Sequence, residues 1–211
     1  MEPRNEPLLS IRRGAPAKLV IATHNPEKAR QYALLLAGSG IELLEAPALE
    51  LPAPEETGET YAANAALKAR AAAMATALPA LGDDAGVEVA ALGGAPGVHT
   101  AEFATVGGRR DWEAARAKLH RALGERPREA AFVCALVLAW PDARELLAEA
   151  RCEGTIVWPP RPPDGGYGLE PIFQPAGSPL TFSEMDPAAK ARGNHRAHAL
   201  ARLDTKLAAR G

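Results

Sequence analysis

The chain has 211 residues, of which 47% are hydrophobic and 24% are charged, and its formal net charge is −2. This composition is typical of a globular protein and argues against a chain that is disordered throughout. A net charge near zero also gives no sign of a nucleic-acid or membrane partner, so a small anionic ligand would need a local basic site.

No apolar run reaches the roughly 18 residues of a transmembrane helix. The start, MEPRNEPLLSIRRGAPA, lacks the apolar stretch of a signal peptide, so we expect residues 1–16 to be a flexible leader and 17–211 to be one domain. Cys134 and Cys152 are expected to be reduced core thiols, and the expected location is the cytoplasm.

The first part of this domain alternates between strand and helix patterns. The expected elements are a buried strand over 18–23, a helix over 27–37, a strand over 41–46 and an alanine-rich helix over 60–77. Pro26 suits the first turn of the first helix, and Gly38 and Gly40 suit its end. Asn64 and Lys68 lie one turn apart in the alanine-rich helix, so they share a face.

The rest of the domain adds a long strand pair. The expected elements are short strands over 80–84 and 87–92, a helix over 111–123, a central strand over 130–140, an antiparallel partner over 145–158, and a C-terminal helix that begins at 187–190 or after Asn194 and runs to about 209. Residues 159–168 are too rich in proline and glycine for regular structure. The order predicts an α/β fold with a mixed central β-sheet and flanking helices. The strand pair and its helix are expected to form a second lobe.

The turn after the first strand, THNPEK, carries polar side chains at a helix N-terminus, where unpaired N–H groups are exposed. Thr23 and Asn25 can form hydrogen bonds there, and Lys28 adds a positive charge, which outlines a phosphate site. The glycines of a Walker P-loop are absent. An ordinary Asn-Pro helix start with a solvated lysine explains the same residues.

Acidic residues occur at two further places. Asp83 and Asp84 follow a strand, where paired carboxylates can bind Mg²⁺ or take a proton from water. Glu55 and Glu56 precede the alanine-rich helix, and a glutamate near Asp84 would complete a magnesium site of oxygen ligands. The alternatives are an aspartate that caps a turn beside an exposed one, and glutamates that only favour the helix N-terminus.

Two segments in the last third can recognise a base. Glycines flank Tyr167, so the backbone can approach a ligand closely and the ring can stack on a base. Lys190, His195 and Arg196 place cationic and hydrogen-bonding groups near a helix start. An aromatic plug in a surface turn and a solvated helix face are the ordinary alternatives. The combination is typical of a nucleoside triphosphate site: it includes hydrogen-bond donors that could bind phosphate, carboxylates, an aromatic ring and a His-Arg pair.

The chain resembles the inosine triphosphate pyrophosphatase family, from about residue 18 to residue 208. The segments that carry the resemblance are THNPEK (23–28), EETGETYAANAALKA (55–69), GDDAGVEVAALGGAPGVHTAEFA (82–104), GGYGLEPIF (165–173), TFSEM (181–185) and KARGNHRAHAL (190–200). The resemblance implies two lobes around an active-site cleft and a homodimer. It also implies Mg²⁺-dependent hydrolysis of ITP, dITP or XTP to the monophosphate and pyrophosphate.

The resemblance further implies a role for each candidate residue. Phosphates would be held by Thr23, His24, Asn25 and Lys28. Asp84 would be the general base and a metal ligand, and Glu55, with Glu56, would complete the metal site. Tyr167 would stack on the base, and the other substrate-binding residues would be Ala85, Gly168, Leu169, Glu170, Lys190, His195 and Arg196.

Several residues depart from the family pattern. The family usually has Ser at Ala85, an aromatic residue at Leu169, Asp at Glu170 and Arg where Glu102 stands. These departures bear on substrate preference and leave the phosphate and metal residues intact. The alternatives are therefore a pyrophosphatase of other modified nucleotides and a catalytically weak nucleotide-binding protein.

Overall fold

The computed structural model describes residues 15–162 and 166–210. Most of the expected leader, residues 1–16, lies outside the described residues. The chain divides into two compact units, each assembled from segments far apart in the sequence. The first unit comprises Met1–Asp84, Cys134–Ala150 and Ala191–Gly211, and the second comprises Ala85–Val133 and Arg151–Lys190. The expected cleft between two lobes stays a prediction.

The first unit is built around strand β1 (Lys18–Ala22). It pairs in parallel with β2 (Glu42–Glu45) and with β3 (Ala80–Val89), and Val20 lies opposite Ala80 in the register. Helix α1 (Pro26–Leu35) connects β1 to β2, and α2 (Tyr61–Thr76) connects β2 to β3. Right-handed crossovers that run in opposite directions place their helices on opposite faces of the sheet.

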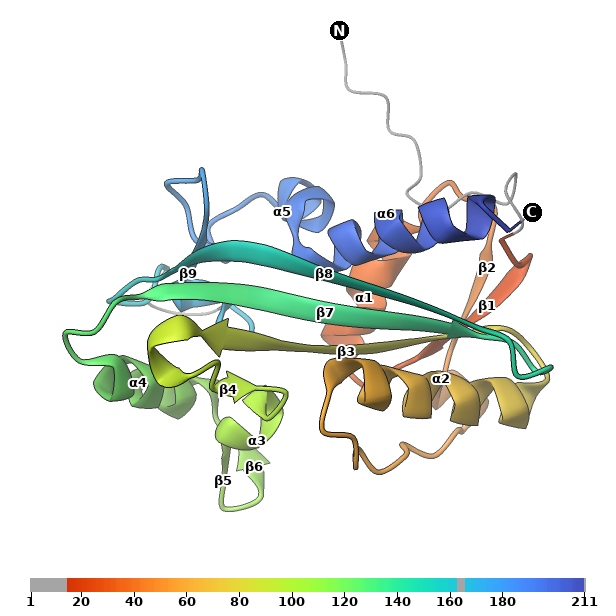
Figure 1. The fold of residues 1–211 in the computed structure, drawn as a ribbon, viewed down its shortest axis with the longest axis horizontal. Coiled ribbons are helices and arrows are strands. Elements are labelled where there is room, and N and C mark those ends of the chain that lie inside the picture. Colours follow the sequence, from red (N-terminus) through yellow and green to blue (C-terminus); the bar gives the residue numbers. More distant parts are fainter. Residues whose placement is uncertain (1–14, 163–165, 211) are drawn as a thin grey trace, which may run out of the picture. The chain divides into compact units, whose positions relative to one another are not determined.

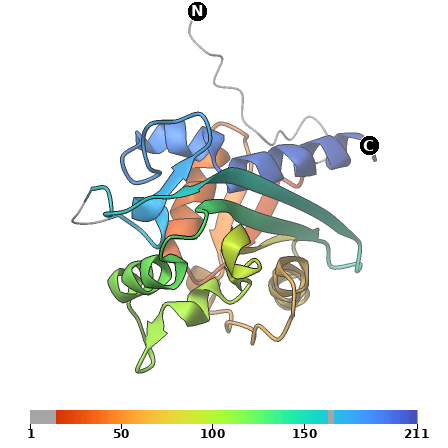
Figure 2. The same ribbon diagram turned by 60° about the vertical axis from the view of Figure 1, so that its left-hand side comes forward.

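The last helix, α6 (His195–Ala208), also covers the first unit. Figures 1 and 2 show α2 on one side of the strands and α6 on the other. A hydrogen bond connects α6 to α1, since Arg196 Nη1 donates to Gln31 Oε1 over 3.2 Å. The ends of α1 and α6 that carry candidate residues therefore lie together.

The strands form a mixed sheet in the order β2-β1-β3-β7-β8-β9. Here β7 is Glu129–Ala139, β8 is Glu145–Ile156 and β9 is Phe173–Pro175, while β4 (Pro96–Gly97) pairs antiparallel with the end of β3. The pair β8–β9 is antiparallel and β1–β3 is parallel, so the predicted mixed central sheet with flanking helices is confirmed. Strands β7 and β8 contribute residues to both units, so the long pair does not belong to one unit alone.

The second unit has its own hydrophobic core. It packs α4 (Trp112–Leu123) against residues of β3, β8 and β9, with Phe173 and Phe182 among its fully buried side chains. The Phe132 ring meets the Phe173 ring edge-on at a centroid distance of 4.7 Å. Its smaller elements are η3 (Ala90–Leu92), α3 (Thr100–Phe103), the hairpin of β5 (Thr105–Val106) and β6 (Arg109–Arg110), and η4 (Glu170–Ile172). The sequence did not predict these short elements.

Two predicted boundaries were wrong. The expected strands 80–84 and 87–92 are one strand, β3, followed by the 3-10 turn η3. The C-terminal region holds two helices rather than one, α5 (Pro187–Gly193) and α6. Asn194 separates them and caps α6, since its side chain accepts a hydrogen bond from Ala197 N over 2.9 Å. A helix therefore begins at each of the two predicted starts.

Buried and capping side chains help to define these elements. Tyr32 and Leu35 are buried on the inner side of α1, and Thr60 caps α2 by accepting from Ala63 N over 3.1 Å. The predicted core thiols Cys134 and Cys152 are both buried, and burial raises the pKa of Cys152 to about 11. The short 3-10 turn η2 (Pro47–Leu49) lies in the loop before α2.

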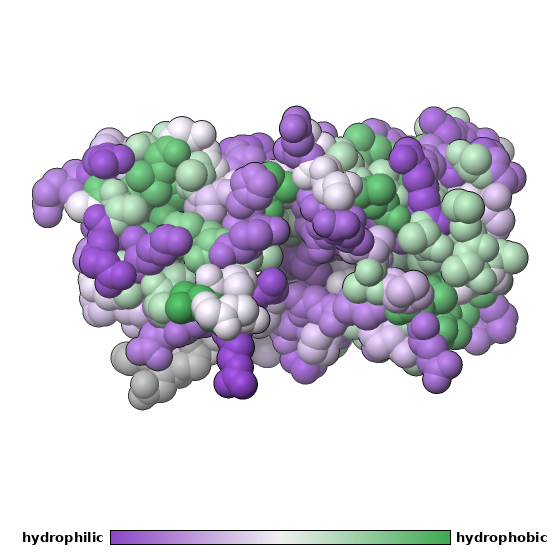
Figure 3. Space-filling view, turned by 90° about the horizontal axis from the view of Figure 1, so that it is seen from below, coloured by the Kyte–Doolittle hydropathy of each residue, from purple (hydrophilic) through white to green (hydrophobic). Residues whose placement is uncertain are grey.

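No helix within the described residues is long and apolar enough to cross a bilayer. Figure 3 shows hydrophilic and hydrophobic side chains interspersed over the face that it displays. The exposed large hydrophobic residues are far apart in sequence and include Leu34, Met74, Val106, Trp158 and Leu180. Isolated apolar side chains of this kind are normal on a protein surface.

Candidate active site

The turn after β1 is a capped helix N-terminus. Asn25 Oδ1 accepts hydrogen bonds from Glu27 N over 3.0 Å and Lys28 N over 3.4 Å, and Asn25 N donates to Thr23 Oγ1 over 3.2 Å. The positive end of the α1 dipole therefore lies at the end of β1, as the sequence predicted. His24 is exposed, and its Nε2 lies 2.8 Å from the carbonyl oxygen of Leu51. Because a carbonyl only accepts, this nitrogen of His24 carries the proton.

Asp83 is the buried anion of the site. Lys28 and Arg196 both form ion pairs with it, the latter from Nε over 2.8 Å, and the hydroxyl of Tyr32 donates to the same carboxylate. Burial alone would raise the pKa of Asp83, but the charges of Arg196 and Lys28 outweigh it and hold the pKa well below its usual range. Asp83 is therefore a permanent anion that orders two cations, and Lys28 is not a freely solvated lysine.

The next residue, Asp84, has a different environment. Lys68 Nζ lies 3.2 Å from Asp84 Oδ1 and 2.8 Å from Glu56 Oε2, and Asn64 Nδ2 donates to Asp84 Oδ2 over 3.4 Å. Burial raises the pKa of Asp84 and Lys68 only partly offsets this, while Glu56 and Asp83 raise it further. Asp84 is thus a stronger base than an ordinary aspartate, as a proton acceptor needs to be.

Lys68 bridges the two acidic segments. Its ammonium also donates to the backbone carbonyl of Asp83 over 3.2 Å. Burial lowers the pKa of Lys68, but Asp84 and Glu56 raise it by more, so Lys68 stays charged. The i, i+4 spacing of Asn64 and Lys68 had shown that they share a face, but the sequence assigned them no role. The structure brings both onto Asp84.

His195 is a neutral imidazole at the start of α6. Its Nε2 lies 3.0 Å from Arg196 Nη1. Because a guanidinium only donates, Nε2 accepts and the proton lies on Nδ1. Burial and the charge of Arg196 lower the pKa of His195 well below its usual value. His195 can therefore donate from Nδ1 and does not act as a cation.

The second unit holds the other candidate residues. The Tyr167 ring lies 5.8 Å from the Trp112 ring, and Lys190 Nζ forms an ion pair with Glu170 Oε2 over 2.8 Å. Gly168 accepts a hydrogen bond on its backbone oxygen from Arg116 Nη1 over 3.0 Å. Leu169 is only 2% exposed and belongs to the hydrophobic core, and its role as a substrate-binding residue stays a prediction.

The predicted residues are divided between the two units. The first contains Thr23, His24, Asn25, Lys28, Glu56, Asp84, His195 and Arg196. The second contains Ala85, Tyr167, Gly168, Leu169, Glu170 and Lys190. Glu55 is exposed, and its backbone oxygen accepts a hydrogen bond from Thr57 N. Over the described ranges, no three or more His, Cys, Asp or Glu side chains are placed to hold a metal.

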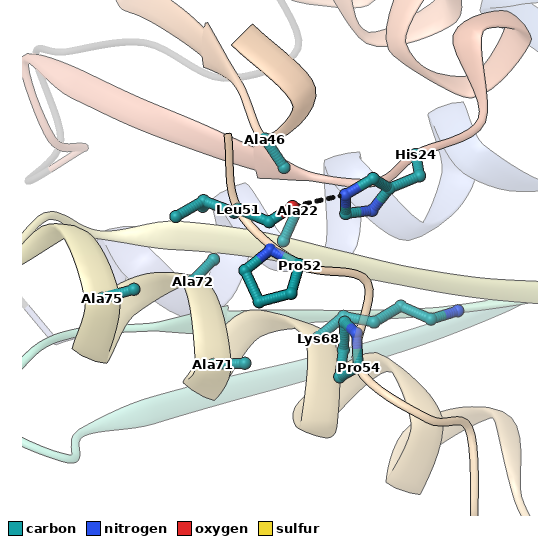
Figure 4. Close-up of a pocket in the computed structure, with 10 residues that line it drawn as sticks. All are labelled: Ala22, His24, Ala46, Leu51, Pro52, Pro54, Lys68, Ala71, Ala72 and Ala75. Carbon is teal, nitrogen blue, oxygen red and sulfur yellow. Dashed lines mark hydrogen bonds between the residues drawn. The ribbon is translucent and has the colours of Figure 1, made fainter. Parts of the chain in front are cut away.

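A cavity of about 60 Å³ in the first unit is lined by His24 and Lys68 among other residues. Figure 4 shows Pro52 and Pro54 on one side of it and Ala72 of α2 on another, while His24 forms its hydrogen bond to the Leu51 carbonyl. Ligand pockets usually have volumes of about 300 Å³ or more. This cavity is therefore too small and too apolar to receive a nucleotide.

The sequence of residues 19–206 matches the model of the Ham1 family. The chain belongs to the Ham1 family. It is 48% identical to a dITP/XTP pyrophosphatase of Gluconobacter oxydans over 185 residues, which cover 87% of this chain and 88% of the relative. The resemblance drawn from the motifs is therefore confirmed.

Solved structures of Ham1 proteins share the fold. A HAM1 protein from Coxiella burnetii superposes with a TM-score of 0.78 at 36% identity, over 90% of this chain and 98% of that one. A nucleoside-triphosphatase / dITP/XTP pyrophosphatase from Mycobacterium abscessus gives a TM-score of 0.67 at 36% identity, over 88% and 97% of the two chains. The mixed α/β architecture is thus that of the Ham1 family.

Proposed function

We propose that this Ham1 protein hydrolyses the non-canonical purine nucleotides ITP, dITP or XTP to the monophosphate and pyrophosphate. The relatives named dITP/XTP pyrophosphatases support this substrate class. The observation that carries the chemistry is the pair Asp83–Asp84. One carboxylate is held as a permanent anion by Lys28 and Arg196, and its neighbour has a raised pKa suited to accepting a proton.

The turn after β1 is proposed to bind the triphosphate. The N-terminus of α1, the hydroxyl of Thr23 and the ammonium of Lys28 supply hydrogen-bond donors and positive charge. Asn25 uses its side-chain oxygen to cap α1, so its contribution is to fix this N-terminus. His24 is proposed to act through its backbone, since its ring forms a hydrogen bond with the backbone carbonyl of Leu51.

Asp84 is proposed to accept the proton of the attacking water. The water oxygen forms a bond to the phosphorus next to the ribose, the bond from that phosphorus to the bridging oxygen breaks, and pyrophosphate leaves. Lys28 is placed to stabilise negative charge on the phosphates. Lys68 stabilises the charged form of Asp84, which is the form that accepts the proton.

The residues present fit a magnesium ion. The carboxylates of Asp84 and Glu56 already converge on one cation, the Lys68 ammonium, and Mg²⁺ is usually bound by one or two carboxylates together with substrate phosphates. A cluster of three acidic side chains is therefore not required. Asp84 and Glu56 would hold the ion, with Glu55 in the same loop as a further candidate. Bound there, Mg²⁺ would neutralise triphosphate charge.

The base is proposed to stack on Tyr167, with Glu170, Lys190 and His195 reading its edge. Neutral His195 can donate from Nδ1 to the carbonyl oxygen at position six of hypoxanthine or xanthine. The amine of adenine at that position would leave such a donor unpaired, which is costly in a dry pocket. The same proposal includes a cytoplasmic location and a homodimer. Light scattering would measure the mass in solution and so test the dimer.

The test is a product assay on the purified chain. Incubation with Mg²⁺ and ITP, dITP, XTP, ATP, GTP or dUTP should give pyrophosphate from the first three, and no activity should remain after Mg²⁺ is chelated. Orthophosphate in place of pyrophosphate would overturn the cleavage position. Turnover of dUTP alone would favour a pyrophosphatase of other nucleotides.

A variant separates catalysis from binding. Asp84→Asn should lower the rate by about 10²–10⁴-fold, the usual contribution of a general base, while ITP still binds. Full activity of Asp84→Asn would contradict the role as base. Binding of ITP by the unaltered chain without any turnover would identify a nucleotide-binding protein instead.

A further inference from the structure

We propose that Trp112 and Arg116 of α4 are positioning residues that hold Tyr167 in the orientation needed to stack on the base. This inference rests on the proposed function, because it assumes that Tyr167 meets a purine. Nothing in the motifs of the sequence assigns a role to either residue. All the residues involved belong to the second unit.

Two residues of α4 contact two consecutive residues of the segment that carries Tyr167. Trp112 and Arg116 are one turn apart, so they share a face of the helix. The Trp112 ring lies 5.8 Å from the Tyr167 ring at an interplanar angle of 58°. Arg116 Nη1 donates over 3.0 Å to the backbone oxygen of Gly168, the next residue. The face of α4 thus contacts consecutive residues of one segment.

The segment itself has little regular structure to define its position. Tyr167 lies between Gly166 and Gly168, whose φ angles of 78° and 61° are in the left-handed region. A Cβ at Gly166 would come within 2.2 Å of Ser183 Oγ, so the backbone also passes close to a neighbouring segment. Its conformation therefore depends on contacts from outside the segment, and α4 supplies two of them.

A buried arginine at position 116 is energetically unfavourable if its only role is to fill space in the fold. It is 8% exposed, and its Nε has no hydrogen-bond partner within the part of the chain that the structure describes. A buried guanidinium carries a large desolvation penalty, which an apolar side chain of similar length would avoid. Its hydrogen bond to Gly168 is what an apolar side chain cannot supply. We therefore infer that Arg116 fixes the position of this carbonyl and, with it, of the adjacent Tyr167.

Trp112 offers Tyr167 a fixed surface. It is the first residue of α4, and its ring is partly buried against the core of the second unit. The Arg110 guanidinium lies 5.6 Å from the centroid of the same ring, within the range of a cation–π contact. A ring that is held by the core and by a guanidinium limits how far the Tyr167 ring can turn.

If the Tyr167 ring is already held in the stacking orientation, it loses less conformational freedom when the base binds, and the affinity is higher. Stacking of a base on an aromatic ring changes affinity by about 5–150-fold. Loosening Tyr167 should therefore raise KM for ITP toward that range. The value of kcat should change far less, because Asp84, Lys28 and the phosphate turn are not altered.

The experiment compares two disruptive variants with two conservative ones. Arg116→Met keeps the length of the side chain without a donor, and Trp112→Leu removes the ring. Both should raise KM for ITP by about 5-fold or more with kcat within about threefold. Trp112→Phe and Arg116→Lys should recover most of the loss. Arg121→Met, an exposed arginine on the same helix, is the matched control and should leave KM unchanged.

Hydrogen exchange provides a readout that needs neither substrate nor metal. The amides of residues 166–170 should exchange faster in Arg116→Met and Trp112→Leu than in the unaltered chain and in Arg121→Met. Unchanged exchange and unchanged KM in both variants would overturn the positioning role even if ITP is hydrolysed. If the unaltered chain does not hydrolyse ITP, the proposed function fails, and exchange still decides whether α4 positions Tyr167. Should Arg116→Met fail to fold, the comparison of Trp112→Leu with Trp112→Phe decides.

Discussion

Arg196 donates a hydrogen bond from Nε to Asp83 Oδ2 over 2.8 Å, although the two residues are 113 positions apart in the sequence. This ion pair connects the first turn of α6 with strand β3. Lys28 of α1 pairs with the other oxygen of the same carboxylate. A single buried aspartate thus fixes two cations that come from the two helices at the candidate phosphate site.

Replacement of Asp83 should therefore destabilise the fold. Asp83→Asn has nearly the same shape but leaves Lys28 and Arg196 without their shared counter-charge. Breaking a buried ion pair from one side usually costs about 3–5 kcal/mol. We expect a loss of this size in the free energy of unfolding, measured by urea denaturation at pH 7.

The matched control is Asp142→Asn. Asp142 also pairs with an arginine, Arg144, at an N–O distance of 2.7 Å, but this pair is exposed. Exposed pairs contribute little to stability, so the control should unfold at nearly the same urea concentration as the unaltered chain. Equal stability of Asp83→Asn and Asp142→Asn would show that Asp83 does not organise the site.

The pKa of Asp84 should shift in opposite directions when the charge of Lys68 or that of Glu56 is removed. Burial raises this pKa, Lys68 lowers it and Glu56 raises it. Lys68→Gln should therefore move the pKa of Asp84 further up, and Glu56→Gln should move it down. Carbon NMR titration of the Asp84 carboxyl in metal-free protein would measure both shifts. Shifts of the same sign would contradict the arrangement around Lys68.

The sequence predicted most of the helices and strands because their signals are local. Pro26 with Asn25, Thr60 and Asn194 mark helix starts, and the long strands are continuous apolar or alternating runs. The continuity of β3 could not be seen in the same way. Two adjacent aspartates inside a strand look like its end, since buried carboxylates are unfavourable unless they are paired. The partners that make them tolerable, Lys28 and Arg196, come from distant segments.

For the same reason, some contacts of the site could not be predicted from the sequence. Tyr32 fits the apolar face of α1, and its hydrogen bond to Asp83 depends on the pairing of β1 with β3. The choice between Glu55 and Glu56 depends on where a proline-rich loop passes α2, which has no sequence signal. The family position occupied by Leu169 predicted a ligand contact, but an aliphatic side chain there is buried in the core.

Acidification should destabilise the protein through His195. Its folded-state pKa lies below the usual value, because burial and the Arg196 charge disfavour the imidazolium. An unfolded histidine titrates near about 6.5, so below that pH the unfolded state binds more protons than the native state. The free energy of unfolding should therefore fall as the pH is lowered from about 7 to 5. Asp83 adds a loss of the same sign only below about pH 4, where an unfolded aspartate titrates.

The variant His195→Gln should flatten this dependence. Urea denaturation at pH 5, 6, 7 and 8 would give the slope for the unaltered chain and for the variant. His198→Gln, an exposed position on the same helix, is the matched control. Identical slopes for the unaltered chain and His195→Gln would contradict the buried, neutral state of this histidine.

The close approach of β3 to α2 gives a last prediction. A Cβ at Gly82 would lie 2.0 Å from the backbone oxygen of Ala65 and 2.8 Å from the backbone nitrogen of Ala69. Because both atoms belong to the backbone of α2, the helix that carries Asn64 and Lys68 would have to move. Gly82→Ala should lower the free energy of unfolding by about 1–3 kcal/mol, as overpacking does.

Asp84 should lose its contact with Lys68 in the same variant, since the helix is displaced at the turn that precedes the lysine. The pyrophosphate assay on Gly82→Ala should therefore show reduced activity even under conditions in which the protein remains folded. Gly193→Ala is the control, because a Cβ there meets no atom within 4 Å. If Gly82→Ala were as stable and active as Gly193→Ala, the separation between β3 and α2 would not set the position of Lys68.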